Sequence, residues 1–585
     1  MTTPASTLVP ASLDASEWEA IQPIFETLRM REVSSKAELE AWLADRSELE
    51  AACSESGARL YINMTCNTED ESASKAYLAF VENVQPRISL ASFELDTVQA
   101  KLAGDLGLTE PRYEVLNRDT DADVELFHEE NVPVKTELAA LSQKYQSIAG
   151  SMTVEFEGET KTLPQMAKIQ ESTDRTRREA AWKAVASRRL EDRDAIDGVF
   201  DEMVAKRHRL ARNANLATYV DYAFASMHRF DYTPADCLKF HDAVEQEIMP
   251  FCGRLDTDRK KDLGLEALKP WDLGVDPKGR EPLSPFDGGA DLVAKSRRVF
   301  EALDDELANL FLQLGDGTNS NGIADGHLLD LDSRRGKAPG GYQYMQDRSR
   351  RPFIFMNAAG VHRDVETMVH EAGHAFHSML CVAEPLLHYR HSPIEFAEVA
   401  SMSMELLSMP YWGVEGGFYE DEADLHRAQR KQLQGTLSLL PWIATIDAFQ
   451  HWIYQNHEHT RDERTAAWNA LIDRFGLMGH RVDWDDETAA SRDTRWHGQG
   501  HPFGNPFYYI EYGIAQLGAL QLWAQSVERG EAVALANYKK ALSLGGSRPL
   551  PELFAAAEIE FDFSASMFAR LRDLVEARLA EIPDA

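Results

Sequence analysis

The chain has 585 residues, of which 44% are hydrophobic and 9% aromatic, so it can bury a substantial core and is too apolar to be a disordered chain. Asp and Glu outnumber Lys and Arg by 96 to 61, which gives a formal net charge of −35. This charge argues against nucleic acid as a partner, because phosphate binding needs clustered cations, and it is typical of a well-solvated acidic surface.

The N-terminal residues Met1–Pro10 lack the basic segment and the continuous apolar segment of a secretory signal. The rest of the sequence has no run of about 18 apolar residues that could cross a bilayer, so we expect no membrane partner. The cysteines are odd in number and widely spaced, which is typical of reduced structural thiols: Cys53, Cys66, Cys237, Cys252 and Cys381. We therefore expect a cytoplasmic protein.

Most of the chain is predicted to be helical, because apolar residues recur at three- and four-residue spacing in segments rich in Ala, Leu, Glu and Arg. Residues 174–210 are an example. Residues 152–163 instead alternate around a Glu-Gly turn and predict a β-hairpin. The expected fold class is mainly α with small β-hairpins. We divide the chain into an N-terminal helical lobe that contains this hairpin, residues 1–195, and a catalytic domain, residues 196–585.

Two tracts rich in proline and glycine, residues 269–285 and 315–341, cannot continue a helix and predict extended connections. After the second tract come Tyr342–Gln346 and Pro352–Met356, two apolar and aromatic segments joined by a polar turn. They predict a second β-hairpin, placed just before a metal-binding motif.

That motif is His370-Glu371-Ala-Gly-His374, which fits the His-Glu-x-x-His pattern. On a helix, residues four apart share one face, so both imidazoles can reach one ion while Glu371 meets the open side of that ion. The helix is supported by apolar residues at three- and four-residue spacing on the opposite face, namely Val365, Met368, Ala372, Phe376 and Met379. We expect His370 and His374 to bind metal and Glu371 to activate water.

The motif supplies two ligands, whereas a catalytic zinc usually has three protein ligands and one open position. Residues 393–407 predict the next helix, which carries Glu395, Glu398 and Glu405 on roughly one side. One of these carboxylates would complete a His, His, Glu set, which suits zinc but leaves cobalt and manganese as alternatives. Spacing alone does not choose among the three.

The segment His370–His377 followed by Glu395–Ser401 resembles the oligoendopeptidase F branch of the thimet oligopeptidase family. Further similarity lies in three short segments: residues 177–182, 271–273 and 336–342. The resemblance implies one zinc ion per chain with Glu398 as third ligand, and Glu405 as the carboxylate that orients a ligand histidine. It also implies a zincin-type fold of two helical lobes enclosing a deep channel for short peptides.

A second segment, residues 497–513, combines glycines, prolines, histidines and tyrosines and passes from a loop into a helical pattern. By itself such a cluster most often means packing with satisfied polar tips. The family resemblance implies that it faces the metal across the cleft. His501 is then the substrate- and oxyanion-contacting histidine, with Tyr508 and Tyr512 as hydroxyl donors and Tyr509 as a substrate-binding residue that could replace either.

The function expected is a zinc-dependent endopeptidase that cleaves oligopeptides, with the strand Pro352–Met356 able to bind extended substrate by strand addition. One alternative is a metallocarboxypeptidase, which can share the motif and a helical channel. Another is a peptide-binding protein that has lost turnover. The sequence leaves the oligomeric state open.

Overall fold

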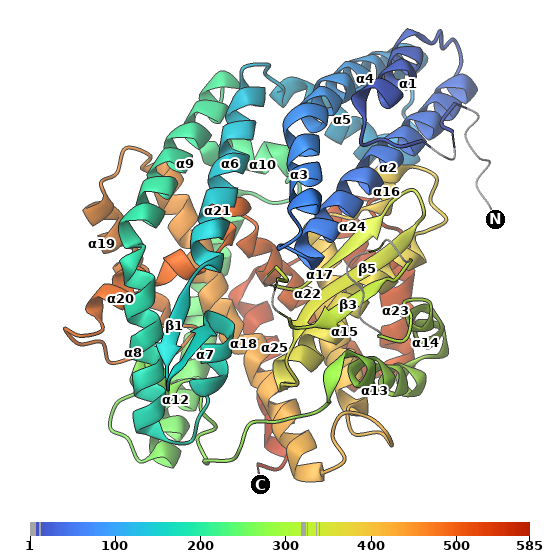
Figure 1. Cartoon of the computed structure of the whole chain (residues 1–585). Coiled ribbons are helices and arrows are strands. Elements are labelled where there is room, and N and C mark those ends of the chain that lie inside the picture. Colours follow the sequence, from blue (N-terminus) through green and yellow to red (C-terminus); the bar gives the residue numbers. More distant parts are fainter. Residues whose placement is uncertain are drawn as a thin grey trace.

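The computed structural model describes residues 8–10, 13–317, 323, 326–334, 336–338 and 340–584. The chain is mainly helical, which confirms the predicted fold class, and its strands form small sheets (Figure 1). Parts of the sequence interpretation fall outside the described residues: Met1–Thr7 of the N-terminus, and residues 318–322, 324, 325, 335 and 339 of the tract 315–341, the last of which also belongs to the stretch 336–342.

The first half of the chain consists of helices interrupted by one hairpin. Its elements are α1 (Trp18–Met30), α2 (Lys36–Cys66), α3 (Glu71–Ala79), α4 (Gln85–Leu106), α5 (Glu114–Leu126), α6 (Asn131–Gly150), β1 (Thr153–Phe156), β2 (Glu159–Thr162), α7 (Leu163–Ile169), α8 (Arg175–Glu191), α9 (Arg193–Asn213), α10 (Tyr219–Ser226), α11 (Pro234–Ala243), α12 (Met249–Leu263), α13 (Gly288–Leu303) and α14 (Asp305–Leu312). Wider π turns join α3 to α4 and α11 to α12, at Phe80–Val84 and Val244–Ile248.

The second half begins with strands and continues as helices. Its elements are β3 (Leu329–Asp332), β4 (Tyr342–Gln346), β5 (Arg351–Ala358), α15 (His362–Leu380), α16 (Leu387–Arg390), α17 (Ile394–Ser408), α18 (Glu422–Gln455), α19 (Arg461–Phe475), α20 (Ala489–Asp493), α21 (His501–Gly504), α22 (Tyr509–Arg529), α23 (Glu531–Leu542), α24 (Leu550–Ala556) and α25 (Ala565–Glu581). Short 3₁₀ turns lie at Pro111–Tyr113, Pro270–Asp272, Met409–Tyr411 and Arg495–Gly498.

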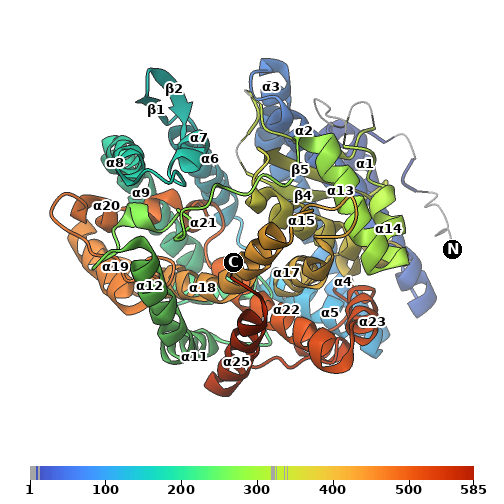
Figure 2. The same ribbon diagram turned by 90° about the horizontal axis from the view of Figure 1, so that it is seen from below.

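The first predicted hairpin is confirmed, since β1 and β2 pair antiparallel with Thr153 opposite Thr162. It packs on α7 and α8 and lies on the opposite side of the molecule from the sheet of β4 and β5 (Figure 2). The predicted helix 174–210 is present as two helices, α8 and α9, which break at Asp192 where the backbone leaves the helical region (φ −98°, ψ 8°). Asp174 caps α8 by accepting the backbone N–H groups of its first turn.

The second predicted hairpin is also confirmed, but it belongs to a larger sheet. β4 pairs antiparallel with β5, from Tyr342 opposite Phe355 to Gln346 opposite Arg351. On its other side β5 pairs in parallel with β3, a strand that we had not predicted within the tract 315–341. Parallel strands such as β3 and β5 are not joined by a tight turn, so no turn motif in the sequence predicts that they pair.

The strand order β3-β5-β4 corrects one expectation about substrate binding. Pro352–Met356 lies within β5, which is the central strand, and both of its edges are used by its neighbours. An added peptide strand needs unpaired backbone groups, so β5 cannot accept one. Within the described part of this sheet, the edge that adjoins α15 is that of β4.

Buried apolar residues form two main cores. One joins α1, α2, α4 and α5, and also includes Leu386, just before α16, and Tyr389 within it. The other runs from Val134 to Ile582 and includes buried residues of α15, α17, α18 and α22. The boundary that we drew at residue 195 falls in the first turn of α9, and the division into 1–195 and 196–585 stays a prediction.

The described cysteines are all buried and unpaired, as expected for reduced thiols. Among the residues that the structure describes, every helix is too short or too polar to traverse a bilayer.

Candidate metal centre

The His-Glu-x-x-His motif lies in the middle of α15, as predicted. Val365, Met368, Ala372 and Phe376 are completely buried and fix the face of the helix that packs into the core. His370 and His374 therefore project from the other face, with ring centroids 5.0 Å apart. The helical periodicity of the sequence is thus sufficient to bring the two imidazoles together.

Gly373, inside the motif, lets the next predicted helix approach closely. A Cβ atom at this position would lie 2.6 Å from Ser401 Cα and 2.7 Å from the carbonyl oxygen of Ala400, both on α17. Real Cβ atoms do not come so near to backbone atoms, so only glycine permits this spacing. The contact brings α17, and with it Glu398, against the face that carries the two histidines.

Both imidazoles converge on one carboxylate oxygen. Nε2 of His370 is 3.3 Å from Glu398 Oε2, and Nε2 of His374 is 3.5 Å from the same atom. Ligand atoms at the corners of a tetrahedron with bonds of about 2.0–2.1 Å are about 3.3–3.4 Å apart, so the three side chains fit a single zinc-sized cation. Glu398 has only 5% of its side chain exposed. Burial raises the pKa of its carboxyl, but the two histidines lower it by more, so it is held well below its usual range.

Glu405, one of the other two candidates on α17, contacts His370 on its far side. Its Oε1 is 2.7 Å from His370 Nδ1, and its Oε2 accepts a hydrogen bond of 2.8 Å from Gln432 Nε2. A carboxylate only accepts, so Nδ1 carries the proton and the lone pair of Nε2 is left for a cation. Glu395, the third candidate, accepts from the hydroxyl of Tyr232 at 2.7 Å and does not join the group.

Glu371 is 6% exposed, and its Oε2 has no hydrogen-bond partner. Its other oxygen would be 3.9 Å from a Cβ at Gly341, just before the edge strand β4. Burial raises the pKa of its carboxyl. Because buried carboxylate oxygens are normally hydrogen-bonded, an unpartnered oxygen beside the two histidines is a place where water would bind.

The C-terminal residues that we predicted gather at the start of α22. The ring centroid of His501 is 5.5 Å from that of Tyr508, 4.9 Å from that of Tyr509 and 5.7 Å from that of Tyr512. The Tyr508 hydroxyl donates to Glu398 Oε1 at 2.9 Å, which joins this segment to the metal group. The Tyr512 hydroxyl lies 3.4 Å from His501 Nε2.

Gln499, which the sequence did not single out, fixes the proton of His501. Trp442 Nε1 donates to Gln499 Oε1 at 3.2 Å, and since an indole N–H can only donate, the amide oxygen must face the indole. The Tyr509 hydroxyl donates to the same oxygen at 3.1 Å. The amide nitrogen then faces His501 Nδ1 at 2.7 Å, so Nδ1 accepts and Nε2 carries the proton. Burial lowers the pKa of His501 to about 4, so the ring is neutral at neutral pH.

Phe507, the residue before Tyr508, has a left-handed backbone with φ of 67°. Its N–H donates to Gln450 Oε1 at 2.7 Å, and its carbonyl accepts from Arg229 Nη2 at 2.7 Å. Arg229 is itself buried and paired with Glu511 at 2.5 Å. Both backbone groups of a strained residue are therefore held by buried side chains of other helices and loops.

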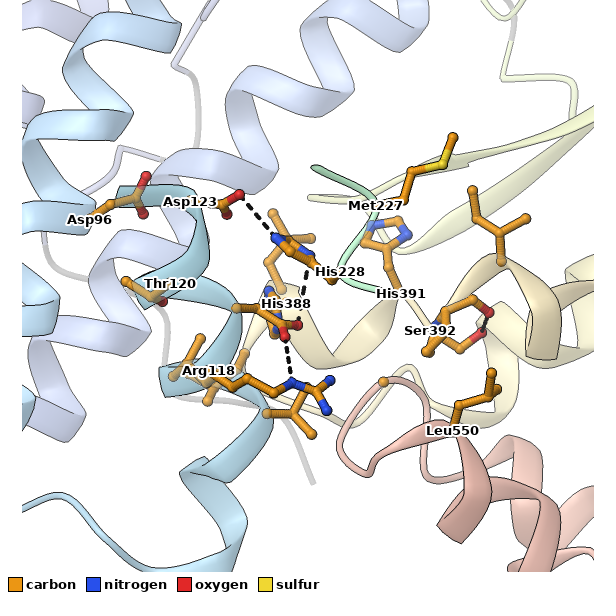
Figure 3. Close-up of a pocket in the computed structure, with 18 of the residues that line it drawn as sticks. Asp96, Arg118, Thr120, Asp123, Met227, His228, His388, His391, Ser392 and Leu550 are labelled. Atoms are coloured by element: carbon orange, nitrogen blue, oxygen red, sulfur yellow. Dashed lines mark hydrogen bonds and ion pairs between the residues drawn. The ribbon is translucent and has the colours of Figure 1, made fainter. Parts of the chain in front are cut away.

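A separate cavity of about 470 Å³ lies between α5, the loop before α11, and α16 (Figure 3). Several of its charged side chains are paired with one another. His228 Nε2 is 2.9 Å from Asp123 Oδ1, and Asp119 accepts from His388 and Arg118, each at 3.1 Å. None of the three converging residues of the metal group lines this cavity. The candidate functional centre is therefore the group on α15 and α17.

The fold and the His, His, Glu group define the class of mainly helical metallopeptidases. Residues 168–573 match the model of peptidase family M3, and the chain belongs to this family. Among solved structures, PZ peptidase A with inhibitor 2 superimposes with a TM-score of 0.87 at 26% identity, over 97% of this chain and 98% of that one.

Two curated relatives carry the name oligoendopeptidase F homolog. The protein from Borreliella burgdorferi is 25% identical over 304 residues, which cover 50% of this chain and 47% of that protein. The protein from Lactococcus lactis subsp. lactis is 24% identical over 426 residues, which cover 71% of this chain and 65% of that protein. The matched regions thus span less than two thirds of the length of either relative. The expected branch of the family is confirmed by these names and by the family match.

Proposed function

We propose that this chain is a zinc-dependent endopeptidase that hydrolyses internal bonds of short oligopeptides. The observation that carries the proposal is the approach of both imidazoles, 3.3 Å and 3.5 Å, to the one oxygen Glu398 Oε2. His370, His374 and Glu398 would hold one zinc ion, with Glu405 orienting His370. When bound, zinc supplies a Lewis acid that acidifies water and polarises a carbonyl group.

Glu371 acts as the general base. Its unpartnered Oε2 beside the two histidines is free to accept a proton from the attacking water. The same carboxyl then returns that proton to the leaving amine, so the residue ends each turnover ionised again. A neighbouring carboxylate that is not itself a ligand suits this role, because it can change protonation without releasing the metal.

His501 and Tyr512 stabilise the negative charge that develops on the scissile carbonyl oxygen. His501 presents Nε2–H because Gln499 occupies Nδ1, and the Tyr512 hydroxyl lies next to that nitrogen. Fixed donors of this kind contribute most when they are aimed before the reaction begins. Tyr508 holds Glu398 in place, and Tyr509 holds Gln499, so we assign these two hydroxyls to positioning.

The edge of β4 binds the substrate backbone in extended form. This strand adjoins α15, and the residue before it, Gly341, approaches Glu371. A peptide paired with β4 would lie along the face that carries the general base. Strand addition reads backbone groups rather than side chains, so it favours a broad range of peptide sequences.

Cleavage of an internally quenched peptide tests the proposal. Wild-type enzyme should be inactivated by a chelator and restored by zinc. Glu371→Gln should lose about 10²–10⁴-fold in kcat while it retains stoichiometric zinc, because only the base is removed. Glu398→Ala should lose both zinc and activity. Near wild-type turnover by Glu371→Gln with zinc bound would overturn the assignment of the base.

A peptide whose C-terminus is amidated separates the endopeptidase from a metallocarboxypeptidase. An endopeptidase should cut the free and the amidated peptide at the same internal bond and at similar rates. A carboxypeptidase needs the free carboxylate and would leave the amidated peptide intact. Binding of either peptide without any product would instead indicate a protein that has lost turnover.

A further inference from the structure

A second group of metal-ligand side chains lies in the core between α11 and α18, helices that pack side by side (Figure 2). Cys237 and His241 are four residues apart on α11, and Asp447 and His451 are four residues apart on α18. Residues four apart share a helix face, so each helix turns one such pair toward the other. Ligand atoms of Cys237, Asp447 and His451 all lie within 4.8 Å of one another.

These groups are buried, and several of their atoms have no partner. Cys237 is 1% exposed, Asp447 0% and His451 3%. Asp447 Oδ1 and both ring nitrogens of His451 have no hydrogen-bond partner. Buried polar atoms are normally hydrogen-bonded, and those left unpaired call for a specific explanation such as an unseen ion.

The spacing around Asp447 resembles that around Glu398. His451 Nε2 is 3.4 Å from Asp447 Oδ2, close to the edge of a zinc tetrahedron, which is about 3.3–3.4 Å. His241 Nε2 is 2.8 Å from the same carboxylate oxygen. It can therefore hold that carboxylate in place, as Glu405 holds His370.

The charges also balance. A thiolate from Cys237 and the carboxylate of Asp447 together neutralise a divalent cation, and His451 binds as a neutral ring. A neutral assembly suits the aromatic surroundings, where the ring of Phe507 is centred 5.1 Å and that of Phe224 6.2 Å from His451. An ion pair of protonated His241 with Asp447 is the metal-free alternative. It leaves Asp447 Oδ1 and the ring nitrogens of His451 without a hydrogen bond, with His451 Nε2 no closer than 3.4 Å to Asp447 Oδ2, and a cation would bind both residues.

We propose that Cys237, Asp447 and His451 bind a second divalent transition-metal ion, of the zinc type, with His241 as the positioning residue. The ion would link α11 to α18, and its ligand His451 contacts the ring of Phe507, the residue before Tyr508. Binding releases the thiol proton to solvent, since the thiolate is the ligand form of cysteine. The site is separate from the His370, His374 and Glu398 group, and it does not depend on the peptidase proposal.

Metal content of the full chain tests the proposal. After removal of loosely bound metal, wild-type protein should contain two equivalents of zinc per chain. Cys237→Ser should lose one equivalent and keep the other, while Glu398→Ala should show the converse loss. Cys252→Ser is the matched control, because Cys252 is also fully buried but belongs to neither ligand group, and it should keep both equivalents.

Cobalt substitution identifies the ligands without reference to activity. A thiolate bound to Co²⁺ gives a charge-transfer band in the near ultraviolet, and only the proposed site contains a thiolate. The band should appear in wild type, persist in Glu398→Ala and vanish in Cys237→Ser. The wild-type measurements decide the matter even if a variant fails to fold. A single equivalent of zinc together with no thiolate–cobalt band would overturn the second site.

Discussion

In two histidines of the candidate centre, a hydrogen bond to one neighbouring side chain determines which ring nitrogen carries the proton. Glu405 accepts a hydrogen bond from Nδ1–H of His370, so the lone pair of the neutral ring is on Nε2. Gln499 does the reverse for His501, because its amide nitrogen donates to Nδ1. The neutral imidazole of His370 is therefore prepared to bind a metal through Nε2, whereas that of His501 is prepared to donate a hydrogen bond from Nε2. The two histidines differ because Nδ1 faces a carboxylate oxygen of Glu405 in His370 and the amide nitrogen of Gln499 in His501.

Replacing Gln499 with Glu should reverse the role of His501. A carboxylate can only accept a hydrogen bond, so the neutral ring of His501 would carry its proton on Nδ1 and no longer on Nε2. The negative charge would also raise the pKa of His501 above its wild-type value of about 4. In wild type the ring is neutral at every pH well above 4. In the variant, protonation would set in as the pH falls toward the raised pKa.

We therefore expect kcat of Gln499→Glu to fall by about 10²-fold at pH 7.5, the usual effect of losing one oxyanion donor. It should recover partly at lower pH, where the protonated ring regains Nε2–H. The pH profiles of kcat for both proteins check this, and Gln499→Met serves as a control that removes the hydrogen bond without adding charge. A Gln499→Glu profile that parallels the wild type would contradict the assigned tautomer.

At the scale of helices, the centre depends on how closely α15 and α17 approach. Three of the five residues of the motif are proposed to bind the metal or to activate water, and a fourth, Gly373, determines the spacing of the helices. Without that glycine the carboxylate of Glu398 could not stay 3.3 Å from His370 Nε2. The metal geometry is therefore a property of a helix pair, not of one helix.

Gly373→Ala tests this dependence, because helix propensity and steric overlap with α17 change the stability of the protein in opposite directions. Alanine favours an isolated helix over glycine by about 1 kcal/mol, so propensity alone predicts stabilisation. The overlap with Ser401 Cα should win, because forcing atoms into a packed core costs about 1–3 kcal/mol. We expect a lower melting temperature and weaker zinc binding, measured by thermal unfolding and by competition with a chelator.

Gly435→Ala on α18 is the matched control, since a Cβ there meets nothing within 4 Å. It should leave stability equal or slightly higher, and zinc affinity unchanged. If Gly373→Ala behaved in the same way as this control, close helix approach would not be what places Glu398.

The helices and hairpins around the centre could be predicted from the sequence because their signals are local. The spacing of Val365, Met368 and Phe376 predicts α15, and the polar turn after Gln346 predicts the hairpin of β4 and β5. β3 was missed because its partner is parallel and distant in the chain. Gln499 was missed because a loop glutamine matches no motif. Cys237 was interpreted as a structural thiol, since its proposed partners on α18 are visible only when the helices are packed.

For the whole molecule, the prediction concerns the size of the substrate. His370 and His374 have only 19% and 18% of their side chains exposed, and Glu398 has 5%. A peptide bond can therefore reach these residues only if the segment that contains it is not packed against the rest of the substrate. A flexible peptide can do this at little cost, whereas a folded protein must first unfold locally. This agrees with the enclosed channel that the family resemblance implies, which we retain as a prediction.

A small protein that contains one good cleavage sequence provides the test. The isolated peptide should be cut rapidly, the folded protein at least about 10²-fold more slowly, and a destabilised variant of that protein at an intermediate rate that follows its unfolded fraction. Mass spectrometry of the products gives the bond that is cut in each case. Equal rates on folded and unfolded substrate would show an open cleft.

The left-handed backbone of Phe507 connects these scales. Arg229, on a loop before α11, and Gln450, on α18, grip the peptide groups on either side of that residue, and Tyr508 follows immediately. The orientation of Tyr508 thus depends on the buried guanidinium of Arg229, which is far from it in the sequence. Selection for better turnover could therefore favour substitutions near Arg229, at positions that never meet a peptide, and a search restricted to the cleft would overlook them.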